Sequence, residues 1–171
     1  IYPVIFLSFK DAHQNTCEEM YKSICFTLKE EFIRHIELLS SDKVNAYDKK
    51  YYERIVNETA ELSDYQFALG KLSSMTATYY NKKVIIIIDE YDTPIQQGHL
   101  YSYYDEIVSF VRNLLSSALK DNEHLEFGIL TGILRIAKES IFRGLNNLVV
   151  NTILDDKYAA YFGFTENDVE E

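Results

Sequence analysis

Apolar positions along the chain fall into short continuous runs and longer stretches with helical spacing. The runs at residues 4–9, 84–88 and 125–131 are short and rich in β-branched or aromatic residues, which predicts strands. A run at residues 148–154 predicts a fourth strand. Because residues 84–88 are all β-branched and apolar on both faces, we expect this strand at the centre of a sheet.

The longer stretches repeat apolar residues at steps of three and four, which predicts amphipathic helices. These helices are expected at residues 15–39, in two segments between Tyr52 and Tyr79, and at residues 104–118. The pair Thr93-Pro94 predicts a turn before the helix at residues 104–118. Thr165 and Asp168 form a capping box, so residues 165–171 are expected to begin a following helical segment.

Strands that alternate with helices indicate an α/β fold, a parallel sheet flanked by helices. Sheets of this kind bind ligands at the carboxyl ends of their strands. The 171 residues suit one compact unit, and six glycines with two prolines leave no stretch typical of a linker.

The net charge of the chain argues against a nucleic-acid partner. Lys and Arg total 17 against 27 Asp and Glu, and the net charge of -10 would repel a nucleic-acid backbone. No basic cluster offsets this charge. The apolar runs are too short to cross a membrane and no signal peptide opens the chain, so we expect a cytoplasmic protein.

Two adjacent carboxylates, Asp89 and Glu90, follow the central strand, at the edge where ligands bind. This pattern is typical of a Walker B strand, in which the first carboxylate holds Mg²⁺ and the second polarises the water that attacks the γ-phosphate of ATP. The alternative is that both acids merely end the strand, capping a helix or facing solvent. Asp92 is a third carboxylate here, and with Thr93-Pro94 after it we favour a turn or helix start over a metal ligand.

Thr131 ends the next strand, where a nucleotide hydrolase would place a hydroxyl that senses the γ-phosphate. Arg135 follows, and a guanidinium at this edge can stabilise the charge of a transferring phosphoryl group. A surface salt bridge to Glu139 or a neighbour explains Arg135 equally well. For Lys138 and Arg143 we favour the salt bridge.

The P-loop pattern G-x-x-x-x-G-K-[ST] does not occur in these residues. Gly70-Lys71 is the one Gly-Lys pair, and it lies within helical periodicity, so we interpret Gly70 as a helix glycine. Without the phosphate cradle of a P-loop, we expect these residues alone to bind nucleotide weakly or not at all.

Four segments in order along the chain resemble the bacterial AAA-ATPase-like family of signal-transduction-type P-loop ATPases. They are Tyr2-Pro-Val-Ile-Phe-Leu-Ser-Phe9, Ile86-Ile-Ile-Asp-Glu-Tyr-Asp-Thr-Pro-Ile95, Thr131-Gly-Ile-Leu-Arg-Ile-Ala-Lys-Glu-Ser-Ile-Phe-Arg-Gly-Leu-Asn-Asn147 and Tyr161-Phe-Gly-Phe-Thr-Glu166. The resemblance implies that Asp89 and Glu90 are the Walker B pair and that Thr131 and Arg135 lie in the phosphate-sensing segment. Asn146 and Asn147 match a family pair whose role does not follow from these residues.

The resemblance also implies that residues 1–164 are part of a P-loop ATPase domain whose P-loop unit precedes Ile1. The P-loop strand of such ATPases lies between the strand of Thr131 and the final strand. We expect that strand to be present elsewhere in the protein, or replaced by another chain or by a rearranged final segment. Exposed strand edges would allow self-association. Members of the family often carry a nuclease-like domain further along the chain.

The leading hypothesis is a module of a larger bacterial protein that binds and hydrolyses ATP with Mg²⁺ and acts as a conformational switch. We expect ATPase activity in the full-length protein and none from these residues alone. The alternative is a catalytically silent interaction module that keeps the ATPase fold. A metal-dependent nuclease using Asp89 and Glu90 is a weaker hypothesis, because no catalytic lysine follows them.

Overall fold

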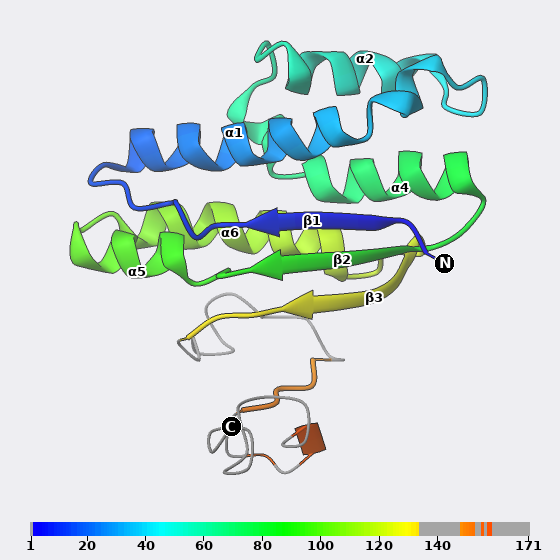
Figure 1. The fold of residues 1–171 in the computed structure, drawn as a ribbon. Helices are drawn as coiled ribbons and strands as arrows, with labels where there is room; N and C mark the ends of the chain where they lie inside the picture. The colour runs from blue at the N-terminus through cyan, green and yellow to red at the C-terminus, as the bar shows by residue number, and fades with distance from the viewer. Residues whose placement is uncertain (1, 134–147, 153–154, 156, 159–171) are drawn as a thin grey trace, which may run out of the picture.

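A computed structural model describes residues 2–133, 148–152, 155 and 157–158, and its centre is a parallel sheet of three strands (Figure 1). The strands are β1 (Val4–Ser8), β2 (Val84–Asp89) and β3 (Leu125–Leu130), in the order β1-β2-β3. Both pairings are parallel. The predicted α/β fold is therefore confirmed, and the five consecutive β-branched residues form the central strand.

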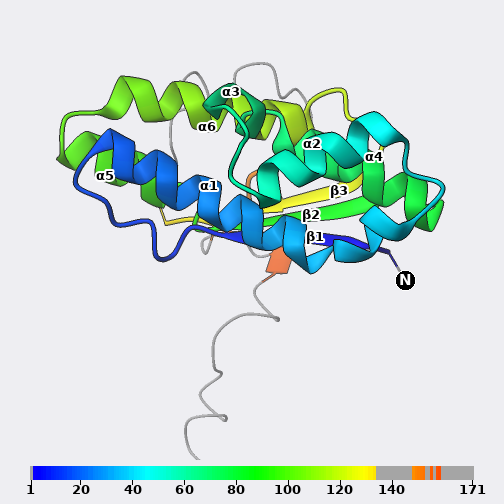
Figure 2. The same ribbon diagram turned by 90° about the horizontal axis from the view of Figure 1, so that it is seen from above.

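The helices lie together on one side of this sheet (Figures 1 and 2). In chain order they are α1 (Cys17–Arg34), the 3-10 helix η1 (Ile36–Ser40), α2 (Ala46–Val56), α3 (Leu62–Tyr65), α4 (Ala68–Tyr80), α5 (Thr93–Leu100) and α6 (Tyr104–Leu119). Helices α1, α4 and α6 contact β1, β2 and β3, respectively. Between α1 and β1 the core contains fully buried side chains such as Ile24 and Leu28 of the helix and Ile5 of the strand.

Three helix predictions need correction. The helix expected at residues 15–39 ends at Arg34, because His35 leaves helical geometry and its N–H bonds to Phe32, after which the chain continues as η1. The helix expected up to Tyr79 is split into α3 and α4 around Phe67. The turn expected at Thr93-Pro94 is instead the first turn of α5, where proline is tolerated because its missing N–H has no partner to lose.

The fourth predicted strand is also wrong within the described residues. Residues 148–152 have no regular secondary structure, and the three described strands pair only with one another. An apolar β-branched run becomes a strand only when a neighbouring backbone accepts its hydrogen bonds. Residues 153–154 and the helix expected from Thr165 lie outside the described residues.

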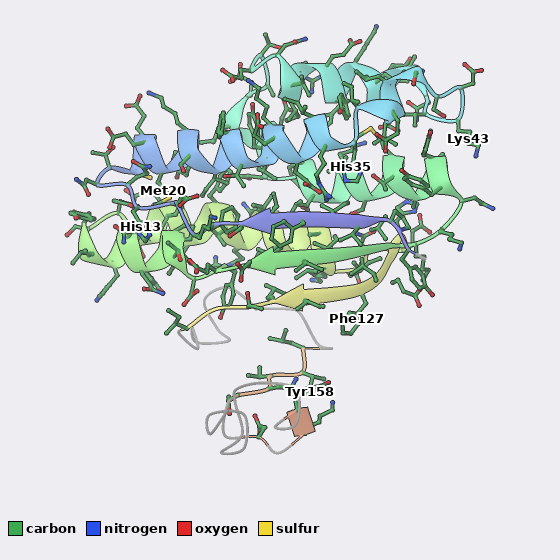
Figure 3. The ribbon with its side chains drawn as sticks, in the orientation of Figure 1. His13, Met20, His35, Lys43, Phe127 and Tyr158 are labelled. Atoms are coloured by element: carbon green, nitrogen blue, oxygen red, sulfur yellow. The ribbon has the colours of Figure 1, made fainter. Side chains whose placement is uncertain are left out.

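The two faces of the sheet are unequally covered. Side chains of one face, including Ile5, Leu7, Ile86 and Ile88, are fully buried beneath the helices. On the other face Phe6 and Phe127 are 44% and 59% exposed, and Figure 3 labels Phe127 where it projects from β3. We call this second face the open face. Its central apolar members, in register across the strands, are Phe6, Ile85, Ile87, Phe127 and Ile129.

The outer edge of β1 is covered by side chains of α1. The Pro3 carbonyl and the Phe9 N–H form hydrogen bonds to β2. Because successive residues of a strand point their backbone groups to alternate sides, the N–H and carbonyl groups of residues 4 and 6 point away from β2. The Phe6 N–H donates to Glu31 (2.7 Å) and Arg34 donates to the Val4 carbonyl (2.9 Å). Glu31, only 5% exposed, thus joins the sheet edge to α1.

Glu31 also binds its helical neighbours. Arg34 donates two hydrogen bonds of 2.7 Å to the Glu31 carboxylate, and the His35 ring lies 3.2 Å from it. Burial by itself raises the pKa of Glu31, but the hydrogen bonds from His35, Arg34 and the Phe6 N–H, with the charge of Arg34, leave that pKa below its ordinary value. Glu31 therefore stays ionised and paired on folding.

Replacing Glu31 should show how much this edge contact stabilises the fold. We expect Glu31→Gln to lower the free energy of unfolding by about 2 kcal/mol at pH 7, the typical worth of hydrogen bonds to a charged group. Because the pKa of Glu31 is lowered by folding, its contribution is present above the ordinary carboxyl pKa and lost as pH falls through the lowered value. Urea unfolding at several pH values measures both effects. The exposed neighbour Glu30 supplies the control, and Glu30→Gln should change stability by less than about 0.5 kcal/mol.

Gly70 is required for close packing of α4 against α6. A Cβ at this position would lie 2.6 Å from the backbone oxygen of Ser117, a contact that neither helix can relieve by a side-chain rotation. We expect Gly70→Ala to destabilise the fold by about 1–3 kcal/mol although alanine is the better helix former. Thr78→Ala, at an exposed position of α4, should not destabilise, and thermal unfolding compares the two variants.

Candidate functional site

Three polar side chains meet at the carboxyl edge of the open face. Ser8 ends β1 and stands opposite Asp89 of β2 in the register. Thr131 follows β3, and its N–H donates to the Ile88 carbonyl (3.0 Å), so it continues the same ladder. Because side chains of paired strands alternate between faces in step, all three project on one side of the sheet.

The Asp89 carboxylate is the centre of this group. Its Oδ1 accepts a hydrogen bond from the Thr131 hydroxyl, and its Oδ2 accepts one of 3.4 Å from the Ser8 hydroxyl. Asp89 is half-buried, so one carboxylate with hydroxyl oxygens on either side remains within reach of solvent. Mg²⁺ takes oxygen ligands in proteins, generally one or two carboxylates together with several waters and the phosphate oxygens of a nucleotide.

Glu90 occupies an unusual backbone conformation directly after the strand. Its φ is 52°, in the left-handed region that residues with a Cβ rarely adopt. The Glu90 carbonyl accepts the Thr93 N–H (3.1 Å), and the Thr93 hydroxyl donates to the Glu90 carboxylate (3.4 Å). The turn between β2 and α5 therefore holds the Glu90 carboxylate against the Thr93 hydroxyl, at a cost in backbone strain.

Asp92 differs from the other two acids in being buried, with 1% of its surface exposed. It stands at the start of α5, as its sequence context favours, but its side chain makes no cap to its own helix. Its Oδ2 instead accepts hydrogen bonds from the Gln96 side chain (2.7 Å) and from the Ile133 N–H (3.1 Å). Asp92 thus joins the start of α5 to the segment that follows β3.

The structure places three of the predicted site residues, Asp89, Glu90 and Thr131, at one edge of the sheet. Arg135, the remaining predicted site residue, lies outside the described residues, as do Lys138, Arg143 and the pair Asn146 and Asn147. Sequence reasoning missed Ser8, although a polar residue near the end of an apolar strand is a usable signal once that strand is known to neighbour β2.

The described residues lack two further features that would bear on function. Among them, no group of three or more His, Cys, Asp or Glu side chains is arranged to hold a metal ion by protein ligands alone. In the part of the chain that the structure describes, no helix is both long and apolar enough to cross a membrane.

Comparison with known proteins connects this geometry to a family. Residues 1–142 match the AAA-ATPase-like family, which is described as a predicted AAA-ATPase. A protein of Azotobacter chroococcum mcd 1, described as an uncharacterized protein in the vnfD 5' region, is 34% identical over 102 residues, which are 59% of this chain and 20% of that relative. The match therefore spans about a fifth of the relative's length. No solved structure matches the chain.

The strain at Glu90 gives a prediction about stability. Glu90→Gly and Glu90→Ala remove the same carboxylate, but only glycine adopts a positive φ without steric cost. We expect Glu90→Gly to be more stable than Glu90→Ala by about 1 kcal/mol, the cost of left-handed geometry for a residue with a Cβ. Chemical unfolding of both variants measures the difference, and equal stabilities would show that the turn is not strained.

Proposed function

Because the chain belongs to the AAA-ATPase-like family, we propose that it forms the Walker B and sensor part of an ATP-binding and ATP-hydrolysing module that depends on Mg²⁺. The observation that carries the proposal is the hydrogen bond from Thr131 to Asp89 at the carboxyl edge of a parallel sheet. It joins the acid that follows the central strand to the hydroxyl at the end of its neighbour, at the edge where α/β sheets bind ligands.

Each residue at this edge has a proposed role. Asp89 holds the magnesium ion directly or through water, Glu90 polarises the attacking water, and Thr131 senses the γ-phosphate. The bound magnesium nucleotide supplies an activated phosphoryl group. The protein positions the water and stabilises the charge that spreads over that group. Arg135, four residues beyond Thr131, is the proposed source of positive charge for this purpose.

The open face suggests how the P-loop of the complete protein would be placed. Its apolar side chains, among them Phe6, Phe127 and Ile129, lie in register across the three strands and lead to Asp89 at the edge. We propose that the P-loop strand pairs with β3 and that its helix packs on the open face. This arrangement would bring the phosphates to Asp89 and Thr131 and bury the apolar surface.

In the complete protein we propose a cytoplasmic conformational switch that hydrolysis resets, with a nuclease-like domain further along the chain as a candidate effector. The competing proposal is a catalytically silent interaction module that keeps the ATPase fold. ATP turnover by the complete protein separates the two.

Substituting the Walker B acids tests the proposed roles. In the complete protein we expect Glu90→Gln to lower kcat by about 10²- to 10⁴-fold with little change in KM, because general-base assistance is lost while the nucleotide still binds. Asp89→Asn should instead raise the Mg²⁺ concentration needed for half-maximal turnover. Glu53→Gln, at an exposed position on α2, is the control and should behave as the unaltered protein. Unchanged turnover in Glu90→Gln would contradict its role.

A further inference from the structure

Asp92 contacts a segment far from it in the sequence. A carboxylate at the start of a helix ordinarily accepts N–H groups of its own first turn. Asp92 makes no such bond, and its Oδ2 accepts the N–H of Ile133, 41 positions along the chain, at 3.1 Å. The Gln96 side chain, one turn further into α5, donates to the same oxygen at 2.7 Å. The carboxylate is therefore hydrogen-bonded both to α5 and to the segment at residues 131–133.

Residues 131–133, which we call the sensor segment, are tied to the carboxyl end of β2 and the turn after it at several points. The N–H of Thr131 donates to Ile88 (3.0 Å), and its carbonyl accepts the Tyr91 N–H (3.1 Å). The Thr131 hydroxyl donates to Asp89. The hydrogen bond to Asp92 holds Ile133, two residues further on. The turn that begins at Thr131 is therefore fixed at both of its ends.

Gly132 shows how closely Asp92 packs against this segment. A Cβ on Gly132 would lie 2.5 Å from Asp92 Oδ1 and 2.9 Å from its Cγ. The same Cβ would lie 2.9 Å from Cε1 of the buried Tyr91 ring. Real Cβ atoms do not approach other atoms so closely, so the carboxylate and the Gly132 backbone pack without room for any side chain between them.

We propose that Asp92 is a positioning residue for the magnesium-triphosphate site. By holding Ile133 and packing on Gly132, it fixes the sensor segment so that the Thr131 hydroxyl stays on Asp89 and at the place where a γ-phosphate would arrive. Because Asp92 stands at the start of α5, a displacement of Thr131 would also shift α5. This inference rests on the proposed function for its catalytic part, but the structural contact stands without it.

The contact itself is tested by amide hydrogen exchange of the nucleotide-free protein, followed at Ile133 by NMR. We expect Asp92→Ala to speed exchange of the Ile133 amide by about tenfold, as the loss of one hydrogen bond implies. Asp92→Asn keeps an acceptor oxygen and should restore most of the protection, which a general loss of packing would not do. Asp105→Ala, an exposed acid at the start of α6, is the control. Unchanged Ile133 exchange in a folded Asp92→Ala variant would overturn the proposal.

Packing against Gly132 is tested by a double substitution. Gly132→Ala should displace the sensor segment in the presence of Asp92 and speed Ile133 exchange in the same way. In the Asp92→Ala background the two closest atoms are gone, so adding Gly132→Ala should have a smaller effect there than alone. Strictly additive effects would show that Asp92 and Gly132 do not act on each other, and would overturn the packing argument.

The catalytic part is tested by ATP turnover of the complete protein. We expect Asp92→Ala to lower kcat by about tenfold or more with KM within about twofold, because a displaced sensor segment misplaces the reacting groups while the P-loop still binds nucleotide. Asp92→Asn should recover most of that loss. If the unaltered protein turns over ATP and Asp92→Ala matches it, the positioning role is wrong. If the unaltered protein turns over no ATP, the proposed function fails and the catalytic role of Asp92 with it, whereas the exchange result still decides the contact.

Discussion

The parallel register of three strands is the constraint on which the site depends. Ser8, Asp89 and Thr131 are distant in sequence. Ser8 and Asp89 end their strands, Thr131 directly follows β3, and the three side chains lie at the same level on the same face. A shift of one residue in either pairing would turn one of these side chains to the opposite face. The buried apolar alternation, with Ile86 and Ile88 beneath the helices, prevents that shift. Core packing on one face therefore determines the placement of polar groups on the other.

The two faces of the sheet differ in how much of their apolar surface is buried. The covered face contributes the core, with α1, α4 and α6 packed on the strands in turn. The open face carries partly exposed apolar side chains that lead to Asp89 at the carboxyl edge. Leaving such a face in water is unfavourable, since burying one apolar side chain stabilises a protein by about 1.5–3 kcal/mol of free energy. The proposed P-loop unit would cover it and complete the nucleotide site in the same step.

Charged groups in this chain follow two physical regimes. Glu31 is buried with its partners, and the hydrogen bonds around it lower its pKa and fasten α1 to the edge of β1. Glu90 sits instead in a strained left-handed turn, where its position has a conformational cost. Glu31 is thus paired within the fold, whereas Asp89 and Glu90 at the carboxyl edge stay partly exposed to solvent. Asp92 is buried like Glu31, but it lies at the carboxyl edge like Asp89 and Glu90.

Periodicity alone determined the class of fold, the central place of residues 84–88, and the edge at which Asp89, Glu90 and Thr131 lie, because burial on a regular backbone leaves a repeating trace in the sequence. Periodicity did not predict three other features: the early end of α1 at His35, the helix that starts at Thr93-Pro94, and the irregular path of residues 148–152. The end of α1 depends on the backbone geometry of His35, and the start of α5 depends on the turn at Asp92. The path of residues 148–152 depends on whether a neighbouring strand pairs with them. The roles of Ser8, Asp92 and Gly132 likewise emerged only in three dimensions, because single polar or small residues become informative when tertiary structure shows what they touch.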